Sequence, residues 1–350
     1  MIGFLSQTGY ILIGILLLGI LVAVHEFGHF IAARATGIEV MEFAIGMGPK
    51  IVGWTGKSGT KFSLRCIPLG GFCAFYGEDD VEGKTKDDPR AYGKQNVWKR
   101  IFTVAMGPMM NFVLALVVAF GFFFFLGENT TIPVVDALME GYPAAAAGLL
   151  PGDRIIQVDN AAIEDSAAVV AALSKGGEAK VTVLREGEEH TFTIVPKWNE
   201  EDQRYLIGIY FAQTRAKLDF LTSVRAGWDN CVRAGSAVFD ALGGLFTKEG
   251  MEQVSGPVGA VAVVSQAVQA DGIDAFLSLL MLISVNLGLM NLLPIPGLDG
   301  SRIVFHLIEA VRGKPIKPER EAMVHLIGML FLFSLMIFFT YKDIVRIFFN

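Results

Sequence analysis

The feature that most constrains this chain is an uncharged N-terminal segment that runs directly into three ionisable side chains. Residues 1–24 contain no charged residue, and the sequence continues His25-Glu26-Phe-Gly-His29. An apolar segment of this length predicts a helix that spans a membrane. An ionisable side chain within such a helix costs roughly 2.5–3.5 kcal/mol on insertion scales, so it indicates a functional site by default. The end of this first span is therefore the first candidate site.

The spacing of the two histidines suits a metal ion. On a helix, His25 and His29 share one face, and Glu26 lies one step further round. This is the H-E-x-x-H pattern of zinc hydrolases, in which two imidazoles bind the metal and the glutamate acts on a water molecule. A pair of histidines that only hydrogen-bond within the core is the alternative. The position within a spanning segment favours the metal site.

The composition as a whole indicates a polytopic membrane protein. Of 350 residues, 53% are hydrophobic and 18% are charged, and the apolar residues occur in blocks. The formal net charge of -6 argues against nucleic acid as a partner. The three cysteines, Cys66, Cys73 and Cys231, lack Cys-x-x-Cys spacing, so neither a disulfide framework nor a structural zinc site is indicated.

Four segments are long and apolar enough to cross ~30 Å of hydrocarbon. They begin near residues 8, 101, 275 and 323. Lysine and arginine are concentrated in the loop 34–100 and in the loop after the third span. Because loops rich in basic residues stay in the cytoplasm, both are expected there, with both termini and segment 128–274 outside. The histidine pair then lies at the cytoplasmic end of the first span.

These patterns divide the chain into four parts. Residues 1–127 are expected to form the first part of a membrane domain and residues 272–350 the second, with a soluble domain at 128–214 between them. Residues 215–271 are expected to be an amphipathic linker with surface helices. Apolar residues recur there at helical spacing over 221–246, which predicts a helix that lies on the outer membrane surface or packs on the soluble domain. The fold class is a polytopic α-helical membrane protein with an inserted β-rich domain.

The first connecting loop is rich in glycine and in apolar residues that favour β structure. Residues 37–77 are predicted to form short strands separated by glycine turns. Such a loop offers a strand edge to which an extended peptide can add, and Gly70 and Gly71 are then candidate substrate-binding residues. A β-hairpin that only packs against the helices is an equally good interpretation.

The segment 128–214 has the pattern of a compact β domain with two helices. Residues 179–185 and 190–196 alternate as a hairpin. The run Ala147-Gly-Leu-Leu-Pro-Gly-Asp-Arg-Ile155 resembles a signature of PDZ domains. The segment is therefore expected to be a PDZ domain inserted between the second and third spans.

The third span ends in residues that interrupt a helix at membrane depth. Asn291-Leu-Leu-Pro-Ile-Pro-Gly-Leu-Asp299-Gly combines two prolines, two glycines and one carboxylate. Irregular backbone is tolerated there only where protein or a water-filled cavity surrounds it. Asp299 is therefore the natural third ligand of a zinc site that keeps its fourth position open. The alternative role for Asp299 is to cap the helix that follows.

Together these motifs resemble the site-2 protease family of intramembrane zinc metalloproteases, and the bacterial regulators of envelope stress most closely. The resemblance rests on H-E-F-G-H at 25–29, N-L-L-P-I-P-G-L-D-G at 291–300, the glycine-rich loop at 46–72, S-G-P-V-G at 255–259 and the inserted PDZ-like segment. Several Gram-negative relatives carry two tandem PDZ domains, whereas this chain has room for one.

The resemblance implies a role for each candidate residue. It makes His25, His29 and Asp299 the ligands of Zn²⁺. It makes Glu26 the catalytic base, and it gives Asn291 the task of holding the substrate strand or the developing oxyanion.

The resemblance also implies a biological setting, regulated intramembrane proteolysis in a stress response. The expected reaction is hydrolysis within or near the spans of single-span proteins, after an initiating protease of the site-1 type has shortened them outside. Anti-sigma factors and remnant signal peptides are the expected substrates. The expected location is the bacterial cytoplasmic membrane.

Two other functions remain open at this point. A catalytically inactive membrane scaffold could gather partner tails with its PDZ domain, but it would have no use for Glu26. A metal transporter would also place His, Glu and Asp at mid-membrane. It would be expected to show more than one polar span, and here the second and fourth spans offer only Asn111 and His325.

Overall fold

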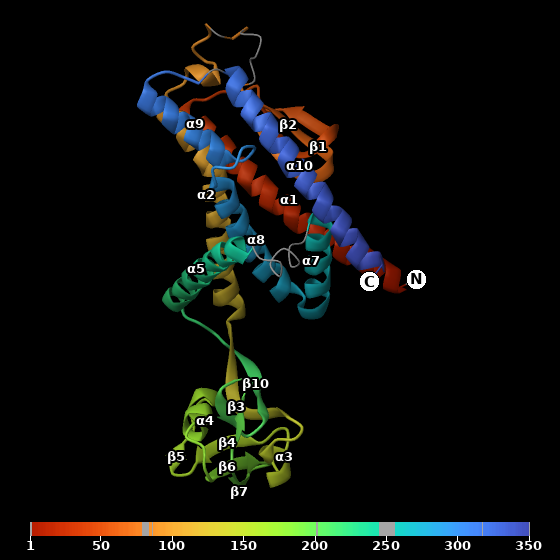
Figure 1. The fold of residues 1–350 in the computed structure, drawn as a ribbon, viewed down its shortest axis with the longest axis vertical. Helices are drawn as coiled ribbons and strands as arrows, with labels where there is room; N and C mark the ends of the chain where they lie inside the picture. Colours follow the sequence, from red (N-terminus) through yellow and green to blue (C-terminus); the bar gives the residue numbers. More distant parts are fainter. Residues whose placement is uncertain are drawn as a thin grey trace. The chain divides into compact units, whose positions relative to one another are not determined.

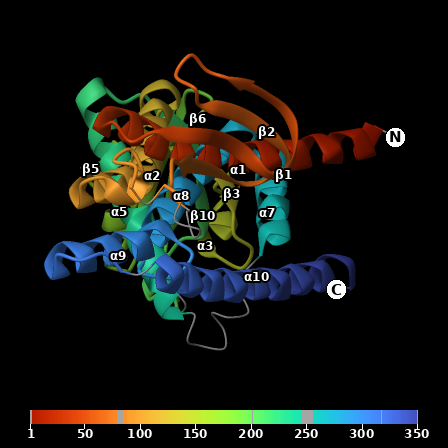
Figure 2. The same ribbon diagram turned by 90° about the horizontal axis from the view of Figure 1, so that it is seen from above.

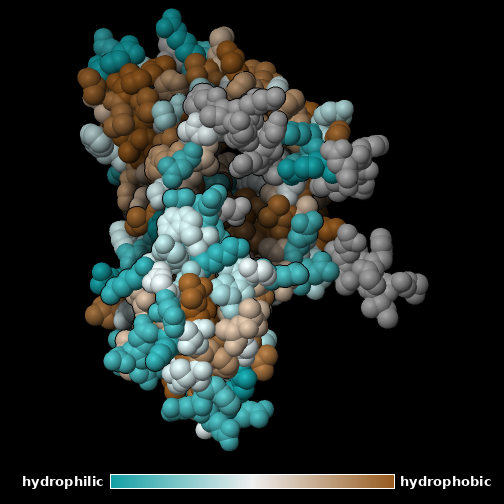
Figure 3. All heavy atoms as spheres, turned by 60° about the horizontal axis from the view of Figure 1, so that its bottom comes forward, coloured by the Kyte–Doolittle hydropathy of each residue, from teal (hydrophilic) through white to brown (hydrophobic). Residues whose placement is uncertain are grey.

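The computed structural model describes residues 2–78, 84–85, 87–200, 202–244, 256–316 and 318–349. The chain forms two compact units (Figure 1). The membrane unit comprises Met1–Phe122 and Leu221–Asn350, and the soluble unit comprises Phe123–Phe220. In Figure 3 apolar side chains gather over the helices of the membrane unit, whereas the soluble unit presents a largely hydrophilic surface.

Four helices in the described part of the chain are long and apolar enough to cross a membrane, which confirms the predicted number of spans. They are α1 (Ile2–Thr36), α2 (Val97–Gly121), α8 (Ile273–Leu292) and α10 (Pro318–Phe349). The apolar stretch of α2 continues through a π-helical turn, η2 (Phe122–Leu126). A helix is suited to lipid because most of its backbone hydrogen bonds are made within the segment itself.

Close packing of α1 on α2 depends on a glycine. A Cβ atom added to Gly28 would lie 2.2 Å from the carbonyl oxygen of Met106. Small residues of this kind allow membrane helices to approach closely. The H-E-x-x-H segment of α1 is therefore pressed directly against α2.

A shorter helix, α7 (Pro257–Asp271), lies between α1 and α10 (Figure 2). Its Val264 and Val268 are buried against Leu17 and Leu21 of α1. At its first turn, the buried carboxylate of Asp343 in α10 accepts the backbone N–H of Gly259 at 2.7 Å. A Cβ atom at that glycine would lie 2.7 Å from the Asp343 carboxylate, so this contact requires glycine.

The helix α5 (Phe220–Gly244) also packs on spanning helices. Ala234 is buried with Ala115 and Ala119 of α2 and with Val285 of α8. The sequence pattern predicts a linker with surface helices over 215–271, whereas the structure packs both α5 and α7 into the membrane unit. The predicted apolar stripe is partly used for this packing and partly exposed, as at Trp228.

The loop between α1 and α2 forms two long bent strands, β1 (Val40–Thr55) and β2 (Lys61–Phe75), in place of the predicted short ones. The first half of β1 pairs with both ends of β2, so the hairpin folds back on itself. Gly46 and Gly48 lie at positive φ at this bend, a conformation that glycine adopts at no steric cost. The paired segments follow the order 50–55, 61–65, 40–45, 71–75. Residues 71–75 therefore form an edge of this small sheet, called the edge segment below.

The soluble unit is built on an antiparallel sheet in the order β10-β3-β4-β6-β7, with β5 paired to β4. The strands are β3 (Glu128–Leu138), β4 (Arg154–Val158), β5 (Ala161–Ala162), β6 (Ala179–Arg185), β7 (Glu188–Ile194) and β10 (Ile209–Ala216). Two helices, α3 (Pro143–Ala147) and α4 (Ser166–Leu173), and a small hairpin, β8 (Lys197–Asn199) with β9 (Arg204–Leu206), complete it. Alternating valines and isoleucines, such as Val181 and Val183, fill its core. The predicted two-helix β domain is present.

Two short elements complete the membrane unit. The 3₁₀ turn η1 (Tyr92–Lys94) precedes α2, and α9 (Asp299–Arg312) follows the irregular residues 293–298. A Cβ atom at Gly300 would lie 2.2 Å from the carbonyl oxygen of Leu293, so the start of α9 packs directly on the end of α8.

Candidate metal centre

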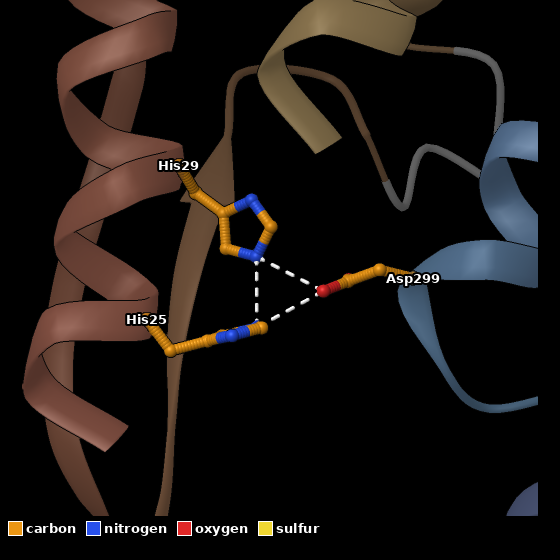
Figure 4. Close-up of side chains that lie close together, drawn as sticks. All are labelled: His25, His29 and Asp299. Carbon is orange, nitrogen blue, oxygen red and sulfur yellow. Dashed lines mark hydrogen bonds and ion pairs between the residues drawn. The ribbon is translucent and has the colours of Figure 1, made fainter. Parts of the chain in front are cut away.

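Three side chains from the two halves of the chain converge on one point (Figure 4). Nε2 of His25 lies 2.9 Å from Oδ2 of Asp299, and Nε2 of His29 lies 3.3 Å from the same oxygen. The two Nε2 atoms lie 3.2 Å apart. Two ligands of a tetrahedral zinc ion, each at about 2.0 Å from it, would lie roughly 3.3 Å apart. The observed separations therefore suit a shared metal ion.

Each imidazole is oriented by a partner on α2. Nδ1 of His29 donates to the carbonyl oxygen of Thr103 at 3.0 Å, which leaves the lone pair of the neutral ring on Nε2. Nδ1 of His25 lies 3.1 Å from the side-chain amide of Asn111, whose nitrogen is placed nearest to the ring. The two ends of an amide are assigned from hydrogen bonding. With Oδ1 towards His25, the amide accepts Nδ1–H and gains a partner for an oxygen that otherwise has none among the described residues.

Three lone pairs thus point at one another. Nε2 of both histidines is an acceptor, and Oδ2 of Asp299 is buried without a well-aligned hydrogen bond from any residue that the structure describes. Acceptors crowded in this way repel one another unless a cation lies between them. Two imidazole nitrogens and one carboxylate oxygen form the donor set of catalytic zinc sites. The residues present fit a zinc ion.

A glycine of α2 makes room for this arrangement. A Cβ atom added to Gly107 would lie 2.3 Å from Nε2 and Cε1 of His29. Any larger side chain would push the imidazole away from Asp299. The helix α2 thus contributes both the carbonyl oxygen of Thr103, which accepts from His29, and the space beside Gly107 for the imidazole ring.

A cavity of about 360 Å³ opens beside the three donors. Glu26 lines it together with the histidines, and the edge segment forms one wall. Because residue 71 is a glycine, this wall can lie close to the side chain of Glu26. A Cβ atom at Gly71 would lie 3.0 Å from Cγ of Glu26. The remaining lining residues are Glu78, Val104, Gly297, Leu298 and Arg302. A base, three metal donors and a strand edge therefore share one cavity.

Most residues predicted for the site meet in this cavity, and two lie apart from it. Gly71 lines the cavity, whereas Gly70 adopts a φ of 79° beside Met47 and is not among the lining residues. Asn291 lies in the last turn of α8 and is not among them either.

The structure does not place Asp299 in its alternative role as a helix cap. Leu298 occupies the N-cap position of α9, and no side-chain capping hydrogen bond is present there. The carboxylate of Asp299 faces the histidines (Figure 4).

Several contributors to the site were not found by the sequence analysis. The roles of Thr103, Gly107 and Asn111 depend on which residues of α1 they face, although Asn111 stands out as a polar residue in an apolar span. Glu78 and Arg302 line the cavity as an ion pair, with Nη1 and Oε1 2.5 Å apart. Their only signal is the spacing Asp299-x-x-Arg302, which places both side chains on one helix face.

Comparison with known proteins gives consistent matches over nearly the whole chain. Residues 13–335 match Peptidase family M50. A protein of Agrobacterium fabrum named "Putative zinc metalloprotease Atu1380" is 36% identical, over 98% of this chain and 97% of its own length. "Putative zinc metalloprotease CA_C1796" of Clostridium acetobutylicum is 34% identical, over 96% and 97%. "Probable protease eep" of Enterococcus faecalis is 31% identical, over 96% and 98%.

Proposed function

The chain belongs to peptidase family M50, and on that premise we propose that it is an intramembrane zinc endopeptidase with its reaction centre in the cavity beside His25, His29 and Asp299. The observation that carries this proposal is the convergence of three lone-pair donors next to Glu26. The structure supports it further because both histidines have outer hydrogen-bond partners on α2. Such partners fix the tautomer that a metal-binding imidazole needs.

In this mechanism His25, His29 and Asp299 hold the zinc ion. Zinc, when bound, supplies Lewis acidity towards the scissile carbonyl oxygen and towards water. Glu26 takes a proton from the attacking water as the new C–O bond forms at the carbonyl carbon. Glu26 then delivers that proton to the amide nitrogen as the C–N bond breaks. The products are a carboxylic acid and an amine, and Glu26 returns to its starting state.

The edge segment is proposed to bind the substrate backbone. Residues 71–75 pair with β1 on one side, and they line the cavity beside Glu26. An extended peptide can add there as a further strand through main-chain hydrogen bonds. A spanning helix satisfies its own backbone groups, so it must unwind before it can pair in this way. Substrates are therefore expected to be single-span proteins whose spans contain helix-weakening residues.

Substrates and orientation follow from the resemblance and from the distribution of basic residues. We propose anti-sigma factor-like proteins or remnant signal peptides, shortened beforehand by a site-1-type protease, as part of regulated intramembrane proteolysis. The site would lie near the cytoplasmic face of a bacterial cytoplasmic membrane. The soluble unit, with the element pattern expected of a PDZ domain, and both termini would lie on the other side.

The decisive experiment combines metal analysis with cleavage of a single-span test protein by the purified chain. The expected result is one equivalent of zinc and cleavage that stops with a chelator and returns with added zinc. Zinc flux across vesicles without cleavage would favour a transporter. Binding of peptide tails without zinc or cleavage would favour an inactive scaffold.

A further inference from the structure

One face of α9 carries a polar stripe, of which the proposed chemistry uses only the first residue. Asp299 begins the helix, and Arg302, His306 and Glu309 follow at intervals of three, four and three residues. These intervals place all four side chains on the same face of a helix. The helix that begins with a candidate ligand therefore continues with three side chains that point the same way.

The first of the three binds the end of the hairpin. Nη1 of Arg302 lies 2.5 Å from Oε1 of Glu78, and Oε2 of the same carboxylate accepts the backbone N–H of Phe75 at 3.2 Å. Phe75 is the last residue of the edge segment. Arg302 thus connects α9 to the strand that forms one wall of the cavity.

The other two bind Tyr92, in the 3₁₀ turn before α2, and Arg100, in the first turn of α2. Nε2 of His306 lies 3.1 Å from the phenol oxygen of Tyr92. The carboxylate of Glu309 lies 2.5 Å from the guanidinium of Arg100. Tyr92, Arg100 and His306 are 6%, 5% and 4% exposed. Removal of one partner from a buried charged pair leaves the other charge uncompensated, so this cluster strongly favours one arrangement.

The protonation state of His306 determines which of its ring nitrogens donates a hydrogen bond and which accepts one. Burial and the guanidinium groups of Arg100 and Arg302 lower the pKa of His306 to about 3, so the ring is neutral near pH 7. Arg100 lies 3.5 Å from Nδ1, which must accept because guanidinium can only donate. Nε2–H then donates to Tyr92. Both ring nitrogens are used, each in a fixed role.

We propose that Arg302, His306 and Glu309, with their partners Glu78, Tyr92 and Arg100, are positioning residues that set the place of Asp299 relative to the histidine pair. This group is called the α9 brace. The inference rests on the proposed role of Asp299 as a zinc ligand.

The need for a brace follows from how the ligand is attached. His25 and His29 are held directly by α2, whereas Asp299 follows the irregular residues 293–298 and begins a helix of only 14 residues. Rotation or sliding of α9 would move the carboxylate away from the imidazoles. Three contacts spaced along one face oppose both movements. Two of the partners, Glu78 and Tyr92, come from the segment between β2 and α2, and the third, Arg100, lies in the first turn of α2. The brace therefore connects the ligand to the helix that holds the histidines and to the segment that leads into it.

The test is zinc affinity, measured by competition with a chelator for the purified full chain. Direct hydrogen-bond partners of metal ligands change affinity by about 10–100-fold. Arg100 and Glu309 act one step further out, through the position of α9, so Arg100→Gln and Glu309→Gln are each expected to weaken zinc binding by a few-fold up to about tenfold. The exchanged pair, Arg100→Glu with Glu309→Arg, should recover most of that loss. Tyr92→Phe removes only a hydroxyl and keeps the ring stacked on Phe75, so it supplies a folded variant with a smaller expected loss in the same direction.

A matched control for the arginine variant is available on α9. Arg312 lies at the exposed C-terminal end of α9. Arg312→Gln makes the same chemical change as Arg100→Gln and should leave zinc affinity unchanged. A cobalt-substituted sample adds a second measurement, because its visible absorption reports ligand geometry and should change in the brace variants but not in the control.

The outcomes separate this inference from the function on which it rests. If Asp299→Asn weakens zinc binding but folded brace variants, Tyr92→Phe included, bind zinc like the parent, the brace is structural only and the inference is overturned. The inference also fails if the exchanged pair is folded and recovers nothing. If Asp299→Asn itself binds zinc normally, the ligand assignment fails, and the proposed function with it.

Discussion

The side-chain amide of Asn111 lies 3.1 Å from Nδ1 of His25, on the opposite edge of the ring from Asp299. This contact joins the second span to the candidate metal centre through a group that is not among the residues lining the cavity. With the amide oxygen assigned to the position facing Nδ1, Asn111 accepts Nδ1–H, and Nε2 of His25 keeps its lone pair for a metal.

Replacement of Asn111 should weaken zinc binding without removing any ligand. In Asn111→Ala the buried Nδ1–H of His25 loses its acceptor, and we expect zinc affinity to fall about 10–100-fold. Chelator competition measures this directly. Ser265→Ala removes another polar group of the membrane unit, which bonds to carbonyl oxygens in α1 and α7, and should bind zinc like the parent. Equal zinc affinity in both variants would remove Asn111 from the site.

Gly107→Ala should displace His29. The added methyl group would lie 2.3 Å from the ring, a distance that real Cβ contacts do not reach, so either the imidazole or α2 must move. We expect loss of most bound zinc and of cleavage. Gly121 lies on the same helix with no atom within 4 Å of an added Cβ, so Gly121→Ala is the matched control and should retain both. A zinc-loaded Gly107→Ala protein with normal turnover would show that the ring of His29 can shift without loss of function.

Glu26→Gln should abolish cleavage while zinc stays bound. The amide keeps the shape of the side chain but cannot take a proton, and loss of a general base costs on the order of 10²–10⁴ in rate. Turnover of a single-span substrate and zinc content are measured on the same sample. A variant that turns over within about tenfold of the parent rate would exclude Glu26 as the base.

Replacement of residues 130–212 by a flexible linker should reveal what the soluble unit does. The unit has its own core and sheet, so its removal leaves the helices of the membrane unit complete. We expect it to act as a gate, in which case full-length, unshortened substrates become cleavable. Capture of newly cut C-termini predicts the opposite, slower cleavage even of shortened substrates. A folded, zinc-loaded deletion variant that still refuses unshortened substrate would contradict the gate.

Features that depend on local sequence could be predicted, and those that depend on packing could not. The four spans follow from apolar length, and the shared face of His25 and His29 follows from helical spacing. Asp299 could be connected with them because a carboxylate in a proline-rich break at membrane depth needs a partner. Gly107 gives no local signal, because its role depends on which ring of α1 it faces.

The hairpin and the α9 brace also depend on contacts between distant residues, which the sequence does not reveal. Alternation of residues predicts strands in the first loop, but the double pairing of β1 depends on a bend at two glycines and on how the two ends of β2 meet. The brace joins residues more than 200 positions apart, as in the pair Arg100–Glu309. Opposite charges at such a distance could have been paired in many ways.

The division of the metal centre between the two ends of the chain determines when it can exist. His25 and His29 enter the membrane with the first span, but Asp299 is synthesised only after the soluble unit and the third span. During translation the half-made protein therefore carries the base, the edge segment and two donors without the third. On the proposed mechanism it is inert at this stage. The same mechanism predicts that a chain that stops before residue 299 holds its two histidine donors in place but does not cleave peptide bonds.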